Sequence, residues 1–379
     1  MNLNTVAFSP AESRIYMGSP SILRLPSGSI LISHDHFGPA APRNEHGMPD
    51  RTFVYRSGDD GATWHRVAGM TGQWWSGLFL HQGAVWILGV SAEYGHIVIR
   101  RSTDDGATWT QPADSSSGLL FAGGPGGESP NYHCAPVPVL FHSGRIWRAF
   151  EDNTPRHWPQ GFQACVISAG EDSDLLRADS WIMTNKLPYV PDADPPELKD
   201  PKQGEGWLEG NVVCAPCGEL WNVLRVNSGI GDWGAILRIS EDGRHLSLHP
   251  DHPFIPFPGG HTKFTIRRDP ESNRYWTLAN GTVDPLRKVR RQLLSLFSST
   301  DLLSWDFQRR VVGDESLDPQ SNGFQYVDWQ FDGEDIIVAC RTAWNGAHNF
   351  HDANHLTFHV IRRFRDIPPQ ALPLYRFKV

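Results

Sequence analysis

Six short stretches of the chain each combine two apolar segments around a Gly or Asn turn, and this repeat constrains the fold more than any other feature. The turns centre on Gly28, Gly83, Gly144, Gly218, Asn273 and Gly333. They lie 55, 61, 74, 55 and 60 residues apart. Two apolar-rich segments joined by such a turn are the sequence pattern of a β-hairpin. The repeat therefore predicts six hairpins.

An isolated hairpin is marginally stable in water and leaves strand edges unpaired, so six of them are best satisfied by closing into a ring. The spacing leaves room for a four-stranded sheet in each unit. The sequence thus predicts an all-β, six-bladed β-propeller that spans residues 1–379 as a single domain, with a seven-bladed ring as the alternative. The 36 Gly, 29 Pro and 15 Trp suit a turn-rich sheet protein. Closure is expected to pair the strand near Thr5 to Phe8 with strands around Thr357 to Phe364.

A second repeat consists of two near-identical octapeptides, SGDDGATW at 57–64 and STDDGATW at 102–109, which start 45 residues apart. Weaker echoes begin at 239 (ISEDGRHLSL) and 298 (SSTDLLSWDF). Asp and Gly favour a tight turn, because the Asp side chain bonds nearby backbone, and the Trp can pack beneath it. Structural calcium bound by these Asp residues is the alternative. The spacing and closing Glu of an EF-hand are missing, which argues against it.

The octapeptide pattern S-x-D-x-G-x-T-W resembles the Asp-box of the sialidase superfamily. The resemblance extends over essentially the whole chain and implies a six-bladed propeller. It does not by itself imply sialidase activity, because Asp-boxes also occur in lyases and in non-catalytic propellers.

Charged and polar residues gather where the predicted hairpins begin and end. The outgoing strands start at Ser19, Trp75, His133, Glu209, Lys263 and Tyr326. The returning strands end, seven residues after each turn, at Asp35, Val90, Glu151, Arg225, Asn280 and Cys340, with Arg341 next. A strand out and a strand back bring these ends to one face of the ring. We therefore expect a charged mouth at this end of the propeller axis.

Such a mouth contains the groups needed to cleave a glycosidic bond. One carboxyl group protonates the leaving oxygen, while a nucleophile or an activated water stabilises the sugar cation. A sugar that carries its own carboxylate repels a negatively charged nucleophile. A neutral Tyr made basic by a neighbouring Glu avoids this repulsion, and arginines bind the carboxylate with paired hydrogen bonds.

The resemblance to sialidases implies a role for particular residues. It implies Asp35 in SHDHFG as the acid/base and Tyr326 in FQYVDWQFDG as the nucleophile. Glu209 lies sixteen residues before Arg225, the spacing of the family's Glu and second arginine. These two residues would then be the base for the Tyr and a carboxylate ligand.

The first and third arginines of the resemblance fall on Arg14 in SRIYMGSP and on TIRRD. Arg267 is chosen there over Arg268, because strand alternation lets only one of them face inward. Lys263, Arg341 and Trp75 are further candidate substrate contacts, Trp75 as a sugar-stacking surface.

Three departures from the family pattern leave other functions open. The F-R-I-P signature is replaced by SRIYMGSP, the last hairpin ends in ACRTAW, and His133 lies at the mouth. A uronate-specific polysaccharide lyase acting on rhamnosyl-glucuronate or ulvan-type bonds would use His133 or Tyr326 to remove the proton next to the carboxylate. A non-catalytic glycan-binding propeller is the third reading, in which Glu209 and Arg225 form a structural ion pair and Tyr326 packs on Trp329.

The net charge of −8 argues against nucleic acid or an anionic membrane as the main partner. We expect an acidic oligosaccharide or polysaccharide as partner, no cofactor and no catalytic metal. The first residues show no signal peptide and no segment is apolar enough to span a bilayer, so a cytoplasmic location is expected unless the chain is a trimmed secreted form.

Overall fold

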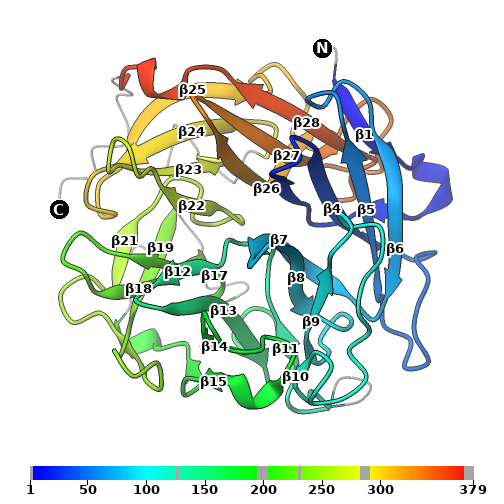
Figure 1. Ribbon diagram of the computed structural model, residues 1–379. Coiled ribbons are helices and arrows are strands. Elements are labelled where there is room, and N and C mark those ends of the chain that lie inside the picture. The colour runs from blue at the N-terminus through cyan, green and yellow to red at the C-terminus, as the bar shows by residue number, and fades with distance from the viewer. Residues whose placement is uncertain are drawn as a thin grey trace.

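Six antiparallel sheets surround a common axis in the computed structural model, which describes residues 3–124, 128–193, 198, 204–228, 232–281 and 291–370. Figure 1 shows the ring viewed with β7, β17, β22 and β26 near its centre. The predicted six-bladed propeller is confirmed and the seven-bladed alternative is wrong. No helix among the described residues is long and apolar enough to cross a membrane.

The strands of each sheet follow the chain from the axis outwards, except that β1 is the outermost strand of the sixth sheet. The strands of the first three sheets are β2 (Tyr16–Met17), β3 (Ser21–Arg24), β4 (Ile30–Phe37), β5 (Arg51–Ser57) and β6 (His65–Thr71); β7 (Trp74–His81), β8 (Ala84–Val90), β9 (Ile97–Ser102) and β10 (Leu119–Phe121); and β11 (Tyr132–His133), β12 (Leu140–His142), β13 (Arg145–Asn153), β14 (Phe162–Gly170), β15 (Trp181–Met183) and β16 (Leu187–Pro188).

The strands of the other three sheets are β17 (Gly206–Cys214), β18 (Leu220–Asn227), β19 (Trp233–Ile239), β20 (Leu246–Leu248) and β21 (Phe254–Pro256); β22 (Thr265–Arg268), β23 (Tyr275–Ala279), β24 (Leu294–Ser299) and β25 (Asp306–Val312); and β26 (Gly323–Asp332), β27 (Asp335–Ala343), β28 (His355–Ile361) and β1 (Asn4–Phe8). Short 3-10 turns η1 (Ala11–Ser13), η3 (Ala178–Ser180), η4 (Pro191–Ala193) and η6 (Phe364–Asp366) lie between strands.

The ring is closed by the pairing of the first strand with the last. Strand β1 runs antiparallel to β28, with Asn4 opposite Phe358 and Thr5 opposite Thr357. The N-terminal strand is therefore the outer strand of the sixth sheet, and the two lie side by side in Figure 1. The predicted closure is confirmed. The pairing joins the two ends of the chain in one sheet and covers the edge that β28 would otherwise leave open.

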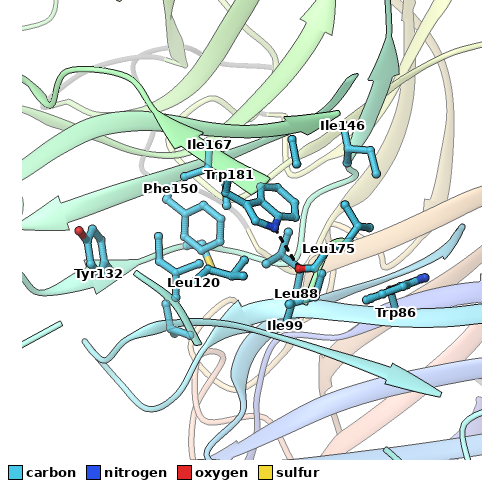
Figure 2. Close-up of a cluster of buried hydrophobic side chains, with 14 of the residues drawn as sticks. Trp86, Leu88, Ile99, Leu120, Tyr132, Ile146, Phe150, Ile167, Leu175 and Trp181 are labelled. Carbon is cyan, nitrogen blue, oxygen red and sulfur yellow. Dashed lines mark hydrogen bonds between the residues drawn. The ribbon is translucent and has the colours of Figure 1, made fainter. Parts of the chain in front are cut away.

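The core is divided among the six interfaces between neighbouring sheets, and each interface has its own cluster of buried apolar side chains. Figure 2 shows the cluster between the second and third sheets. There the buried indole of Trp181 packs among Leu88, Ile99 and Phe150 and donates its Nε1 proton to the carbonyl of Leu175 at 3.0 Å. Each sheet is thus wedged between two others, so the sheets are stable together rather than singly.

The two octapeptides form the same turn. Ser57 Oγ accepts from the amide of Gly61 at 2.8 Å, Asp59 Oδ1 accepts from the amide of Thr63 at 2.9 Å, and Trp64 Nε1 donates to Gly61 O at 3.1 Å. The second octapeptide repeats these bonds at 3.0, 2.8 and 2.9 Å. The two weaker copies of the octapeptide contain a hydrogen bond from Ser240 to Asp242 and one from Ser299 to Asp301.

These turns also join neighbouring sheets, because each one packs on the preceding blade. A Cβ at Gly61 would lie 2.3 Å from the ring of Phe358 in β28, and one at Gly106 would lie 3.0 Å from Leu31 in β4. Gly243, in the third turn, is equally close to Trp147 in β13. In these three turns the glycine has a positive φ and leaves no space for a side chain, whereas the turn at 299 has Leu302 at this place with a φ of 68°.

Replacing Gly61 with alanine should destabilise the fold by about 1–3 kcal/mol, because the residue has a φ of +86° and its Cβ would collide with Phe358. Chemical denaturation followed by tryptophan fluorescence measures the loss. Gly58→Ala is the matched control, since no atom lies within 4 Å of its Cβ position. Equal stability of the two variants would show that the turn does not tie the first blade to the sixth.

Candidate functional site

Tyr326 lies at the mouth, at the end of the ring where the inner strands begin, and is surrounded by three arginines. Arg225 Nη1 donates to the Tyr326 hydroxyl at 3.2 Å. The guanidinium of Arg341 lies 4.8 Å from the centre of the Tyr326 ring, and that of Arg291 lies 5.8 Å from it. The tyrosine ring is partly exposed, whereas Arg225 and Arg341 are buried. The three cations come from the fourth, fifth and sixth units of the ring.

Arg225 also joins Glu209 to this group. The same Nη1 atom donates to Glu209 Oε2 at 2.9 Å, and Arg225 Nε donates to the carbonyl of His261 at 3.0 Å. The predicted meeting of Glu209 and Arg225 at one end of their hairpin is therefore present, with Tyr326 against the pair. Burial raises the pKa of Glu209, but the surrounding positive charges, Arg225 first among them, and the hydrogen bond from Arg225 together outweigh it, so the net pKa lies below the usual value. Glu209 is thus ionised at neutral pH.

The inner strands β7, β17 and β26 each contain a bulge at the mouth. Their ladders shift register between Trp74 and Gly77, between Leu208 and Asn211, and between Gln325 and Asp328. The bulged residues are Trp75, Glu209 and Tyr326, with φ of 46°, 58° and 51°. Such a conformation costs roughly 1–3 kcal/mol for a residue with a side chain. A bulge redirects the side chain, so the strain here turns three residues toward the mouth.

Each bulge is held by a buried charged side chain from the preceding blade. The amide of Trp75 donates to Asp35 Oδ2 at 3.1 Å, and the amide of Gly210, next to Glu209, donates to Glu151 Oε1 at 3.1 Å. Lys263 Nζ donates to the carbonyl of Val327, next to Tyr326. The first, third and fifth blades thus supply the anchors for bulges in the second, fourth and sixth.

Asp35 is enclosed beneath the Trp75 bulge. Its side chain also accepts from Thr52 Oγ1 at 2.8 Å, and only 1% of the residue is exposed. Burial raises the pKa of Asp35 to about 7. Burial likewise lowers the pKa of Lys263 to about 7, although Asp328 opposes the shift. Both groups therefore titrate close to neutral pH.

His133 pairs with Glu151 in the third blade. The distance from His133 Nδ1 to Glu151 Oε2 is 2.7 Å, and both side chains are buried. The imidazole ring packs against the rings of Trp75 at 4.3 Å and Phe162 at 4.9 Å. The exposed indole of Trp158 lies at the same side of the mouth, with Arg225 5.5 Å from its ring centre.

Two of the arginines predicted at the site make no hydrogen bond to Tyr326 in the described part of the chain. Arg267 does face inward, as alternation predicted, but its guanidinium bonds Asp328 Oδ1 at 3.1 Å and the carbonyl of Trp329, and Asp328 in turn bonds Ser21. No hydrogen bond or ion pair joins the Arg14 side chain to another described residue. Neither arginine contacts Tyr326 in the described part of the chain.

Sequence reasoning missed Arg291. It ends a basic stretch, Leu-Arg-Lys-Val-Arg-Arg at 286–291, whose residues before Arg291 lie outside the described ranges. Arg291 is placed by Gln325, to which it donates a hydrogen bond beside Tyr326. The stretch offers several arginines in a row, so no spacing argument could choose among them. In the described residues, no cluster of three or more His, Cys, Asp and Glu is arranged to hold a metal ion.

A closed ring of six sheets of four to six strands around one axis is a six-bladed β-propeller. Neither a protein-family model nor a curated protein matches the chain. Solved structures do match it. An intramolecular trans-sialidase from Ruminococcus gnavus in complex with oseltamivir carboxylate is 12% identical with a TM-score of 0.60, and the match covers 97% of this chain and 98% of that one.

Two other similar structures show that the fold is shared more widely. An α-L-arabinanase from Penicillium chrysogenum in complex with arabinobiose is 15% identical with a TM-score of 0.57, over 97% of this chain and 99% of that one. A leech intramolecular trans-sialidase is 10% identical with a TM-score of 0.60, over 96% and 70%. The six-bladed propeller fold that the resemblance implied is confirmed. At identities this low, structural similarity establishes the fold alone, and the activity has to be argued from the residues of the site.

Replacing Asp35 with asparagine should change how stability depends on pH. A carboxyl with a usual pKa near 3.8 and a folded-state pKa of about 7 binds more protons in the folded protein between these values. Its contribution is therefore favourable below pH ~4 and is lost as the pH rises to 7. Relative to wild type, Asp35→Asn should gain up to about 4 kcal/mol between pH 4 and pH 8.

Urea denaturation at several pH values measures this gain. Asp172→Asn, at an exposed position, is the control and should show no such trend. Parallel curves for Asp35→Asn and wild type would contradict a raised pKa of Asp35.

Proposed function

We propose that this protein is a carbohydrate-active enzyme that hydrolyses the glycosidic bond of a terminal sugar bearing a carboxylate, in the manner of an exo-acting sialidase. The observation that carries the proposal is the group of three arginines around Tyr326. Names of proteins with the same fold, an arabinanase bound to arabinobiose and two trans-sialidases, support a carbohydrate ligand.

The electrostatics of the mouth favour an anionic ligand. Burial lowers the pKa of Arg291, and it lowers the pKa of Arg341 to about 10. Arg341 Nε is buried without a partner among the described residues. A buried N–H without an acceptor costs roughly 1–3 kcal/mol. A substrate carboxylate would supply the missing acceptor and the missing negative charge, which gives the acidic sugar its affinity.

The same geometry suits attack by Tyr326. The phenol and the Glu209 carboxylate both accept from Arg225 Nη1, so the carboxylate lies beside the nucleophile. In the proposed reaction, the Tyr326 oxygen bonds the anomeric carbon as its proton passes to Glu209. The glycosidic C–O bond breaks, and the leaving oxygen takes a proton from Asp35. Water then reverses these steps and releases the free sugar.

Asp35 is the proposed acid/base, because a pKa of about 7 suits a group that gives and takes a proton near neutral pH. Trp75, whose bulge Asp35 holds, is the proposed stacking surface beside the sugar. Lys263 and Arg14 have smaller parts in this proposal, since Lys263 bonds the Tyr326 bulge and Arg14 has no described bond to the site. Arg291 takes the part that the sequence resemblance implied for Arg267.

A second candidate function, a uronate-specific lyase, is favoured by the His133 to Glu151 bond of 2.7 Å. In a lyase, His133 would take the proton from the carbon next to the carboxylate. A double bond would form as the neighbouring C–O bond breaks, and the leaving oxygen would be protonated. The hydrolase is preferred, because the three arginines gather at Tyr326 rather than at His133.

Tyr326→Phe should reduce hydrolysis of an acidic glycoside at least 1,000-fold while leaving the thermal unfolding temperature within a few degrees, because it removes only the attacking oxygen. Mass analysis of products after incubation with a panel of sialosides and uronate oligosaccharides identifies the reaction. A saturated acidic sugar supports the hydrolase. An unsaturated uronate absorbing in the ultraviolet would indicate the lyase, and saturable binding without product would indicate a glycan-binding propeller.

Tyr55→Phe is the control, because Tyr55 lies in β5 and has no contact with the mouth arginines. It should retain wild-type turnover. Unchanged rates in Tyr326→Phe would exclude Tyr326 as the nucleophile.

Arg291→Ala should raise the KM for an acidic substrate by about 10- to 100-fold, the cost of one charge-assisted bond to the carboxylate. A matched neutral glycoside should lose much less. Arg267→Ala should instead lower the unfolding temperature, because it leaves the buried Asp328 without its cation, and its effect on KM should be the smaller of the two. A larger increase of KM in Arg267→Ala than in Arg291→Ala would show that Arg267, rather than Arg291, is the third arginine that binds the carboxylate.

A further inference from the structure

Glu151 contacts two parts of the mouth at once. Its Oε2 atom lies 2.7 Å from His133 Nδ1, and its Oε1 atom accepts from the amide of Gly210 at 3.1 Å. That amide belongs to the bulge whose left-handed residue is Glu209. The carboxylate is fully buried at the end of β13, so both of its oxygens have defined partners.

The chemistry of these partners determines the state of the imidazole. A carboxylate only accepts hydrogen bonds, and the Gly210 amide only donates. His133 Nδ1 must therefore carry a proton that it donates to Glu151. In the neutral ring this leaves Nε2 as the atom with a free lone pair, facing away from Glu151.

The imidazole lies among aromatic side chains, one of which is the bulged Trp75 of the mouth. Its ring lies against Trp75 and Phe162, and Tyr94 stacks on it at 6.0 Å. Aromatic rings around one imidazole nitrogen suit the C–H face and one hydroxyl group of a sugar.

The side chains that hold the other two bulges do so without a histidine. Asp35 and Lys263 hold the equivalent bulges in the second and sixth blades through Trp75 and Val327. Neither of them bonds an imidazole in the described residues. Holding a bulge needs only one hydrogen-bonding atom, and Glu151 uses its second oxygen on His133.

We propose that Glu151 is a positioning residue that fixes His133 and the Glu209 bulge together, and that His133 Nε2 thereby accepts a hydrogen bond from a hydroxyl group of the acidic sugar. This inference rests on the proposed function. The hydroxyl is on the side of the sugar that faces the second and third blades, away from the carboxylate held by the arginines. Substrates with a hydroxyl there are selected over those without it.

Glu151→Gln tests the positioning without any substrate. The glutamine oxygen can still accept from Gly210, but its NH2 group then faces His133 Nδ1 and donates to it. The proton of the neutral imidazole should move to Nε2. Long-range ¹⁵N–¹H spectra of the imidazoles should show His133 as the Nδ1–H form in wild type and as the Nε2–H form in Glu151→Gln. The His133→Gln variant identifies the signal by its loss. An unchanged tautomer in Glu151→Gln would overturn the inference.

Kinetics on an acidic glycoside test the consequence. Glu151→Gln and His133→Gln should each lower kcat/KM about 10-fold or more, and the double variant should lose no more than either one, because both break the same bond. Glu151→Ala should lose more than Glu151→Gln, since the Glu209 bulge also loses its acceptor.

Glu219→Gln is the matched control, because this Glu pairs with Arg238 at the opposite end of β18, and it should keep wild-type kinetics. An active wild type with unchanged kcat/KM in Glu151→Gln would overturn the inference alone. A wild type that hydrolyses no acidic glycoside would overturn the proposed function, while the tautomer measurement would still decide whether Glu151 orients His133.

Discussion

Closure of the ring is the constraint on which the rest of this structure depends. A hairpin alone brings only its own two ends together. Once β1 pairs with β28, six hairpins face one axis and their ends meet. Tyr326 and Arg225 are 101 residues apart in the chain, yet their side chains are within hydrogen-bonding distance. The six clusters between sheets supply the apolar burial that holds this arrangement.

The mouth is built at a cost in both strain and desolvation. Three bulged residues adopt a left-handed conformation, and three charged side chains are buried to hold the bulges. A buried charge is tolerated when its hydrogen bonds are satisfied, and the bulge backbones provide partners for Asp35, Glu151 and Lys263. The hydrogen bonds between these side chains and the bulges therefore offset part of the strain and part of the desolvation. Their combination keeps Trp75, Glu209 and Tyr326 aimed at the axis before any ligand binds, which is the preorganisation that binding and catalysis need.

Much of the fold could be predicted, because hairpins and turns are local. A Gly or Asn turn between two apolar segments needs no distant partner to be recognised, and all six predicted turn residues have positive φ. The pairing of Glu209 with Arg225 was equally local, since it follows from counting along one hairpin. Contacts between blades could not be predicted in this way. Arg291 reaches Tyr326 from another blade, and Arg267 bonds Asp328 instead, so neither position follows from spacing within one unit.

The sequence by itself predicted six hairpin units, the position of their turns and the end of the ring at which polar residues gather. Only the tertiary structure decided which of those residues touch. It placed Arg291 and Arg341 at Tyr326, removed Arg267 from the group and joined His133 to the Glu209 bulge through Glu151. The physical reason is that periodicity sets the direction of a side chain along its own strand. Its partners across the axis depend on the angle between blades and on bulges, which only the closed ring defines.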